Sequence, residues 1–175
     1  MKSILFIHQS AELYGSDKTI LMFISSLDKT KYLPIVILPF EGPLKVEFEK
    51  NNIKVIISPV LKLYRKMFTP SNMIKFFKEY KEGIKALEKL HKEYDFKLVY
   101  SHTLAALIGI SFAQKNNIKH LWHVQEIIAK PKIFNLALLI CFNKFISIKL
   151  ETLIAIMFFF SGFFAHSKTV YLNIE

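Results

Sequence analysis

The sequence predicts an α/β domain built on a doubly wound parallel sheet, and three observations carry this prediction. Short apolar runs alternate with helical patterns along the chain in the order βαβαβαβαβα. The strand-like runs are almost continuously hydrophobic, which is typical of strands buried on both faces. At 175 residues the chain has room for one domain, 1–175, and we expect no second domain of equal size.

Short runs rich in β-branched or aromatic residues are predicted to be strands. These runs are Ser3–His8, Pro34–Pro39, Ile53–Ser58, Lys97–His102, Lys119–Val124 and Gly162–His166. The segments between them that are predicted to be helices are Ser16–Leu27, Pro43–Asn51, Ser71–Tyr94 and Leu104–Asn116. Pro43 suits the first turn of a helix, and Ser71 is a candidate N-cap.

The segment from Ser71 has the clearest helical pattern. Apolar side chains at spacings of three or four predict one buried face, made of Ile74, Phe77, Tyr80, Ile84, Leu87, His91 and Tyr94. A second stripe is made of lysines, with glutamates among them: Lys78, Lys81, Lys85, Lys89 and Lys92. Two interpretations stay open for this stripe, a solvated surface with local charge pairing or a face turned toward a membrane or an acceptor.

The sequence becomes strongly apolar after Pro131. Its two apolar pieces, Ile133–Phe142 and Leu153–Ala165, are shorter than the about 20 residues that a membrane-spanning helix needs. We therefore expect buried helices or a membrane-surface element within 133–165. An internal helix followed by a buried last strand fits the pattern equally well.

Composition narrows the classes of function. Lys and Arg number 24 against 14 Asp and Glu, and the resulting charge of +10 favours anionic partners such as lipid head groups or phosphorylated substrates. A nucleic-acid partner is not expected, because no reading helix or aromatic RNA platform is recognisable. The single cysteine, Cys141, and the lack of zinc-type spacing predict a reducing, cytoplasmic setting without a metal site. The polar N-terminal residues argue against a signal peptide.

Polar residues gather where the predicted strands end. Ligands of open parallel sheets bind beyond the carboxyl ends of the strands, so His102 and His123, which end neighbouring strands with Glu126 close by, are candidate functional residues. His8 and Asp17 belong to the same set of strand-end residues after the first strand. Structural roles for the histidines remain an equal alternative.

Gly15 stands just ahead of Ser16 where a helix is expected to begin, a geometry that can bind a phosphate through free N–H groups. An ordinary tight turn is the alternative at this position. The fingerprints G-x-G-x-x-G, G-x-x-x-x-G-K-[ST] and G-x-S-x-G are missing from the sequence. The sequence therefore gives no motif support for an NAD enzyme, a P-loop ATPase or a serine hydrolase.

Several segments, taken together, resemble the N-terminal domains of glycosyltransferase family 4, which have a Rossmann-like fold and form half of a GT-B enzyme. They are Ile4–His8, Leu13–Ile20, Pro39–Leu44, Asn52–Val55, Val99–Thr103, Trp122–Ile127 and Phe164–Val170. The family often has a histidine directly before the acidic residue that ends the fifth strand, whereas Gln125 precedes Glu126 here.

The resemblance implies a retaining enzyme that transfers a hexose-type sugar from a nucleotide-sugar, its co-substrate, with no other cofactor and no obligatory metal. It implies that this half holds a glycan or lipid-linked acceptor for cell-surface polysaccharide synthesis. Gly15 and Ser16 would approach the donor diphosphate. His102 and Gln125 would bind substrate, and His123 and Glu126 would be catalytic.

The family's donor-binding half is not found in the 175 residues, so we expect the isolated chain to be inactive. We expect a cytoplasmic protein, peripheral at the inner face of the plasma membrane. The alternative function is a noncatalytic membrane-surface or partner-binding subunit that completes a separate glycosyltransferase.

Overall fold

The computed structural model describes residues 1–61, 70–103, 108–124, 155–158 and 169–170. The described strands form one sheet in the order β3-β2-β1-β4-β5-β6-β7. Their bounds are β1 Lys2–His8, β2 Tyr32–Leu38, β3 Lys54–Ile57, β4 Leu98–His102, β5 Lys119–Val124, β6 Ala155–Phe158 and β7 Thr169–Val170. Neighbouring strands run parallel as far as β6, and β7 is antiparallel to β6.

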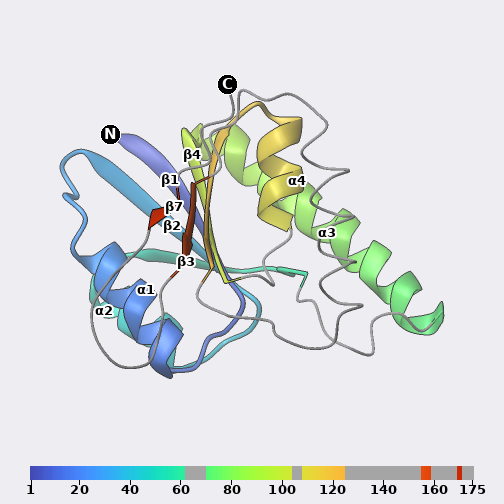
Figure 1. Ribbon diagram of the computed structural model, residues 1–175, viewed down its shortest axis with the longest axis horizontal. Coiled ribbons are helices and arrows are strands. Elements are labelled where there is room, and N and C mark those ends of the chain that lie inside the picture. The colour runs from blue at the N-terminus through green and yellow to red at the C-terminus, as the bar shows by residue number, and fades with distance from the viewer. Residues whose placement is uncertain (62–69, 104–107, 125–154, 159–168, 171–175) are drawn as a thin grey trace.

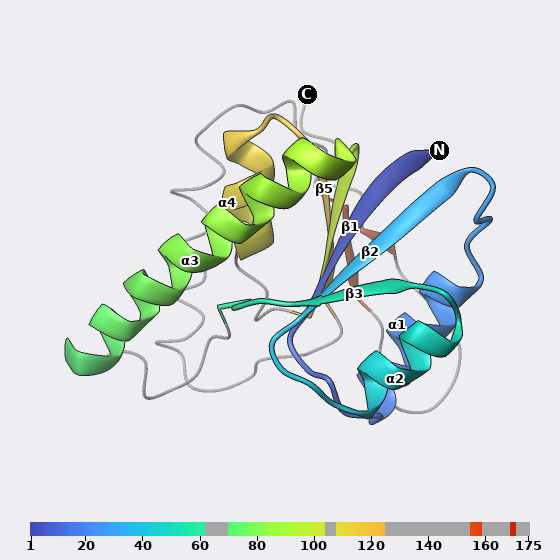
Figure 2. The same ribbon diagram turned by 180° about the vertical axis from the view of Figure 1, so that it is seen from behind.

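The helices cover both faces of this sheet. Figures 1 and 2 show α1 (Gly15–Ser25) and α2 (Pro43–Lys50) on one face and α3 (Pro70–Tyr94) and α4 (Ile108–Lys115) on the other. Pro43 begins α2, where its missing N–H costs no helical hydrogen bond. The predicted class, a Rossmann-like α/β fold with a doubly wound sheet, is confirmed.

Alternation along β1 divides the core into two layers. Leu5 and Ile7 are fully buried in the layer beneath α3 and α4, whereas Ile4 and Phe6 are buried in the layer beneath α1 and α2. Side chains of a strand point to opposite faces in turn, so a strand covered on both sides has to be apolar throughout. This requirement explains the continuous hydrophobic run that ends at His8.

The order of the strands creates a topological switch point between β1 and β4. The chain passes from β1 outward to β2 and β3, then returns to the other side of β1 to form β4 and β5. The connection after β1 leads to α1 on one face, and the connection after β4 leads to α4 on the other. Ligands of doubly wound sheets bind in the crevice beyond the strand ends at such a point.

Three expectations need correction. Ile74 and Phe77 do not belong to the buried face of α3, because Phe76 faces the core in this turn and leaves these side chains 74% and 55% exposed. The helical interpretation of Leu153–Ala165 is wrong at Ala155–Phe158, which pairs with β5 as strand β6. The sheet is not wholly parallel, because β7 reverses direction.

Other expectations fall outside the described residues. These are the strand at Gly162–His166, the apolar piece Ile133–Phe142, and Leu104 to 107 at the start of the fourth predicted helix. A membrane-surface role for 133–165 therefore stays a prediction. None of the helices in the described ranges is both long and apolar enough to cross a bilayer.

Candidate functional site

Three histidines form a row at the switch point. His8 at the end of β1 is in register with His102 at the end of β4, and His102 is in register with His123 near the end of β5. The ring centroids of each neighbouring pair are 4.8 Å apart. All three side chains are buried. Identical register on adjacent parallel strands turns their side chains to one face, and the contact of His8 with Asp17 shows that α1 covers this face.

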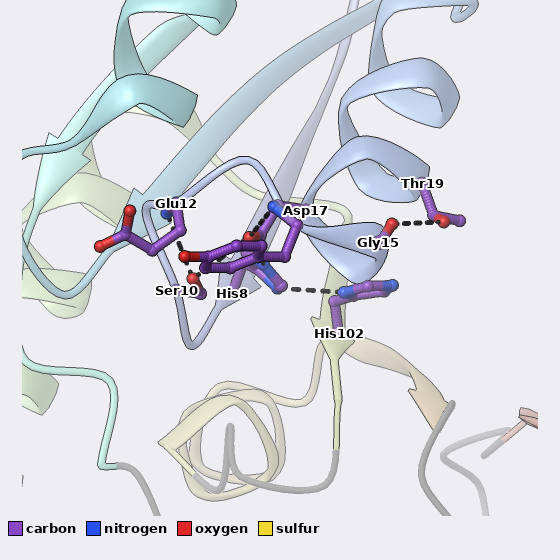
Figure 3. Close-up of polar contacts among 8 residues, drawn as sticks. His8, Ser10, Glu12, Gly15, Asp17, Thr19 and His102 are labelled. Carbon is purple, nitrogen blue, oxygen red and sulfur yellow. Dashed lines mark hydrogen bonds and ion pairs between the residues drawn. The ribbon is translucent and has the colours of Figure 1, made fainter.

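Asp17 in the first turn of α1 anchors one end of the row. One of its carboxylate oxygens lies 2.6 Å from Nε2 of His8, and the other accepts hydrogen bonds from the Tyr14 N–H at 2.9 Å and the Ser10 hydroxyl at 3.3 Å (Figure 3). Burial acts to raise the pKa of Asp17, but the hydrogen bonds from His8, Tyr14 and Ser10 outweigh it and hold this pKa below its ordinary value. Asp17 is therefore a buried carboxylate at neutral pH.

The pairing of His8 with His102 sets the nitrogen that His102 presents. The two Nδ1 atoms lie 3.0 Å apart. When His8 is neutral, its Nε2–H donates to Asp17 and its Nδ1 accepts a hydrogen bond from Nδ1–H of His102. Nε2 of His102 is then a lone-pair acceptor. When His8 is protonated, both of its nitrogens donate, and His102 presents Nε2–H instead.

His102 itself is neutral at neutral pH. Burial, followed by the nearby His8 and His123, lowers the pKa of His102 to about 2. Nε2 of His102 and Oγ1 of the adjacent Thr103 are buried and have no hydrogen-bond partner within the described part of the chain. Leaving a buried polar atom unbonded costs about 1–3 kcal/mol. These two atoms at the end of β4 are therefore suited to bind a ligand.

A hydrogen bond joins His123 to Tyr100 of β4. The hydroxyl of Tyr100 lies 2.6 Å from Nδ1 of His123. Burial raises the pKa of Tyr100 and lowers the pKa of His123, so at neutral pH the phenol keeps its proton and the imidazole is neutral. With both groups neutral, either the phenol O–H or Nδ1–H of His123 donates this hydrogen bond, according to the tautomer of His123.

Thr103 holds a strained backbone conformation directly after the row. Its φ is +74°, a value that β-branched residues rarely adopt. Two hydrogen bonds keep it there: the Thr103 N–H donates to the His123 carbonyl, and Nε1–H of Trp122 donates to the Thr103 carbonyl, both at 2.8 Å. This strained residue directly follows His102 at the end of β4.

The predicted phosphate loop forms the first turn of α1. Gly15 begins the helix and is exposed, Ser16 follows it, and the Gly15 carbonyl accepts a hydrogen bond from Thr19 at 3.0 Å (Figure 3). A Cβ added to Gly15 would have no neighbour within 4 Å. The acidic Asp17 lies in this turn and already takes the Tyr14 N–H. Anion binding by Gly15 and Ser16 stays a prediction.

The structure brings together His102 and His123, as the strand-end argument predicted. Gln125 and Glu126 lie outside the described residues, so their roles also stay predictions. His8 and Asp17 were recognised as strand-end residues but given no role, and Tyr100 was not recognised at all. A polar side chain two positions before a strand-end histidine, on the same face, is the signal that points to Tyr100.

A histidine and a serine form a second polar pair on the opposite face, under α4. Nε2 of His120 is 2.9 Å from the Ser101 hydroxyl, and burial lowers the pKa of His120 to about 4. A Cβ on Gly109 would lie 2.1 Å from that hydroxyl. This close packing makes the pair part of the core. Among the described residues, no group of three or more His, Cys, Asp or Glu side chains is arranged to hold a metal ion.

No protein-family model matches the sequence, and no curated protein matches it either. The fold does match solved structures of GT-B glycosyltransferases. HepE of Anabaena, in complex with UDP-glucose, is 17% identical with a TM-score of 0.60, and the match covers 88% of this chain and 37% of HepE. MurG of Acinetobacter baumannii is 14% identical with a TM-score of 0.55, over 98% of this chain and 45% of MurG.

A glycosyltransferase of Rickettsia africae is 17% identical with a TM-score of 0.54, over 89% of this chain and 42% of that protein. The chain thus spans less than half the length of each of these enzymes. At such identities the likeness shows the fold, the Rossmann-like half of a GT-B architecture.

Proposed function

We propose that this chain is the N-terminal, acceptor-binding half of a retaining, nucleotide-sugar-dependent glycosyltransferase of family 4 that transfers a hexose. It acts in the synthesis of a cell-surface glycan or a lipid-linked saccharide, in the cytoplasm and peripheral to the inner face of the plasma membrane. A second half with the donor site completes the enzyme. The fold of the neighbours and the 35–47% of their length that the chain spans support this proposal.

The observation that carries the proposal is the buried Nε2 atom of His102, held at the switch point by the row that begins at Asp17. With His8 neutral, this nitrogen accepts a hydrogen bond. A sugar hydroxyl matches it, because its O–H can donate. The acceptor hydroxyl is thereby oriented toward the donor sugar.

The remaining roles follow from the resemblance. His123 and Glu126 border the reacting sugar, where a negative charge stabilises the positive charge that develops on the sugar ring in the transition state. Gln125 contributes a substrate contact. Gly15 and Ser16 approach the departing diphosphate, whose stabilisation is the main catalytic effect of the complete enzyme. This half holds the acceptor hydroxyl in place for that reaction.

Histidine-detected NMR of the chain tests the acceptor site directly. We expect the imidazole signals of His102 and His123 to shift on titration with a monosaccharide linked to a short polyprenyl diphosphate. The His120 signals should not move, because this ring lies on the opposite face of the sheet. UDP-glucose alone should perturb the row little and should not be turned over. Saturable binding of UDP-glucose at the row, or multiple-turnover transfer by the chain alone, would contradict the proposal.

A further inference from the structure

Helix α3 has two faces with opposite character. Its inner face packs against the core through Phe76, Tyr80, Ile84, Leu87, Leu90 and Tyr94. Its outer face carries the lysine stripe, defined as Lys78, Lys81, Lys85, Lys89 and Lys92, and all five residues are exposed. Spacings of three or four residues keep the stripe on one side of the helix over roughly 21 Å.

The ion pairs of the α3 glutamates go to lysines outside this stripe. Three of the four glutamates form such pairs: Glu79 with Lys75 at 3.7 Å, Glu88 with Lys115 at 3.0 Å, and Glu93 with Lys54 at 3.8 Å. The fourth, Glu82, is exposed and forms no ion pair with a residue that the structure describes. None of the five stripe lysines forms an ion pair with any residue that the structure describes. Neighbouring like charges slightly destabilise a helix, and an anionic partner facing the stripe would relieve this repulsion.

Exposed apolar side chains lie at one end of the stripe. Ile74 and Phe77 are one helical turn apart, and Ile74 precedes Lys78 by four residues. Figures 1 and 2 show the N-terminal turns of α3 projecting away from the sheet. A row of cations that ends in two exposed hydrophobic side chains matches the chemistry of a membrane interface, which offers anionic head groups above an apolar layer.

We propose that α3 docks on an anionic lipid surface, with Ile74 and Phe77 entering the interface and the lysine stripe lying over the head groups. A polyanion such as nucleic acid would satisfy the lysines but not the two apolar side chains. This inference rests on the peripheral placement proposed above and not on the sugar chemistry. Vesicle binding and the acceptor site can therefore fail separately.

The topology places this contact toward the same edge of the sheet as the histidine row, on the opposite face. The C-terminal end of α3 at Tyr94 is followed almost at once by β4, which begins at Leu98. That end therefore lies at the amino edge of the sheet, and the end with Ile74 lies toward the carboxyl edge, where His8 and His102 are found. A saccharide attached to a lipid in the contacted membrane would thus be delivered to the edge that holds the row.

Sedimentation with vesicles tests the docking surface. The chain is mixed with vesicles of phosphatidylglycerol and phosphatidylcholine at low salt, and with phosphatidylcholine alone. We expect binding to the anionic vesicles only, weakening as salt is added. Lys81→Gln with Lys85→Gln should lower the partition coefficient by about tenfold or more. The matched control is Lys2→Gln with Lys119→Gln, which removes the same charge from exposed strand positions outside the stripe.

A second pair of variants separates lipid from polyanion binding. Ile74→Gln with Phe77→Gln keeps every charge and should lower vesicle binding by about tenfold, while leaving binding to a DNA oligonucleotide unchanged. Thermal unfolding checks that each variant is folded. The proposal is overturned if the chain ignores anionic vesicles or if the control pair loses as much binding as the stripe pair. It is also overturned if the apolar variant binds vesicles as the parent does.

Discussion

Nδ1 of His102 lies 3.0 Å from Nδ1 of His8, although the two residues are 94 positions apart in the sequence. The register of two neighbouring strands produces this pairing. Asp17 contacts the other ring nitrogen of His8 and accepts its hydrogen bond there, which orients the hydrogen bonds along the row. A carboxylate bonded to one histidine, which is bonded to the next, determines the nitrogen that the second histidine presents to a ligand. The first prediction tests this chain of hydrogen bonds.

Asp17→Asn should destabilise the fold by about 1.5–3 kcal/mol, because the buried carboxylate accepts charge-assisted hydrogen bonds from His8 and from the Tyr14 N–H. Asp28→Asn is the control, since Asp28 is exposed and its change should cost little. Urea unfolding measures both. The native pKa of Asp17 is lowered, so its stabilisation is present above the unfolded value near 3.8 and is lost as the pH falls below it. Equal losses in the two variants would remove Asp17 from the network.

His120 should make the protein less stable in mild acid. Its pKa falls from 6.5 in the unfolded chain to about 4 in the folded one, so below pH 6.5 the unfolded state binds the additional proton. Lowering the pH from 7.5 to 5 should therefore reduce the free energy of unfolding by about 2 kcal/mol through this residue. His120→Gln should flatten the pH dependence by that amount. An unchanged slope in the variant would contradict the lowered pKa.

Glu126→Gln and His123→Ala test the catalytic roles in a complete enzyme, formed with its donor-binding half. Each change should lower the initial rate of sugar transfer by roughly a hundredfold, because a group placed at the reacting sugar contributes a few kcal/mol to the transition state. Thermal unfolding of the same samples separates lost chemistry from lost folding. Parental rates and melting temperatures in both variants would place the active cleft elsewhere.

Gly42→Ala and Gly15→Ala form a matched pair on opposite sides of one loop. A Cβ on Gly42 would lie 2.4 Å from the carbonyl oxygen of Ala11, which accepts a hydrogen bond from Leu44 N–H, so this change should cost about 1–3 kcal/mol. A Cβ on Gly15 meets nothing, and Gly15→Ala should leave stability equal or slightly higher. Denaturant midpoints compare the two. In the complete enzyme, a fall in sugar transfer with Gly15→Ala at full stability would support a contact of this turn with the diphosphate.

Local sequence patterns predicted where helices and strands begin and end. They predicted less well which other parts of the fold each helix or strand contacts. Strand β5 begins and ends where the sequence indicated, because its apolar run has sharp polar limits. The burial of Ile74 and Phe77 was predicted wrongly, because apolar side chains lie on more than one side of this turn and spacing alone does not show that Phe76 is the one that faces the core.

In the candidate site, too, local sequence patterns revealed some residues, whereas contacts that depend on the order of the strands were not predicted. His102 and His123 were expected together because they end consecutive strands. The contact of His8 with His102 depends on β4 joining β1 on the side away from β2, and no local pattern encodes the order of strands in a sheet. In the sequence, Asp17 is an acidic residue in the first turn of a predicted helix. An acidic side chain there stabilises the helix through the helix dipole, so its presence needs no other explanation. Only its 2.6 Å contact with His8 distinguishes it.

The central position of β1 also determines when the site can form during synthesis. A ribosome adds about 5–20 residues per second, so the 94 positions that separate His102 from His8 take roughly 5–20 s to synthesise. Throughout this interval one edge of β1 has no strand to pair with, and such an edge favours aggregation. The nascent chain is thus most vulnerable just before β4 appears, and a holdase chaperone acting on the first hundred or so residues would protect the assembly of the histidine row.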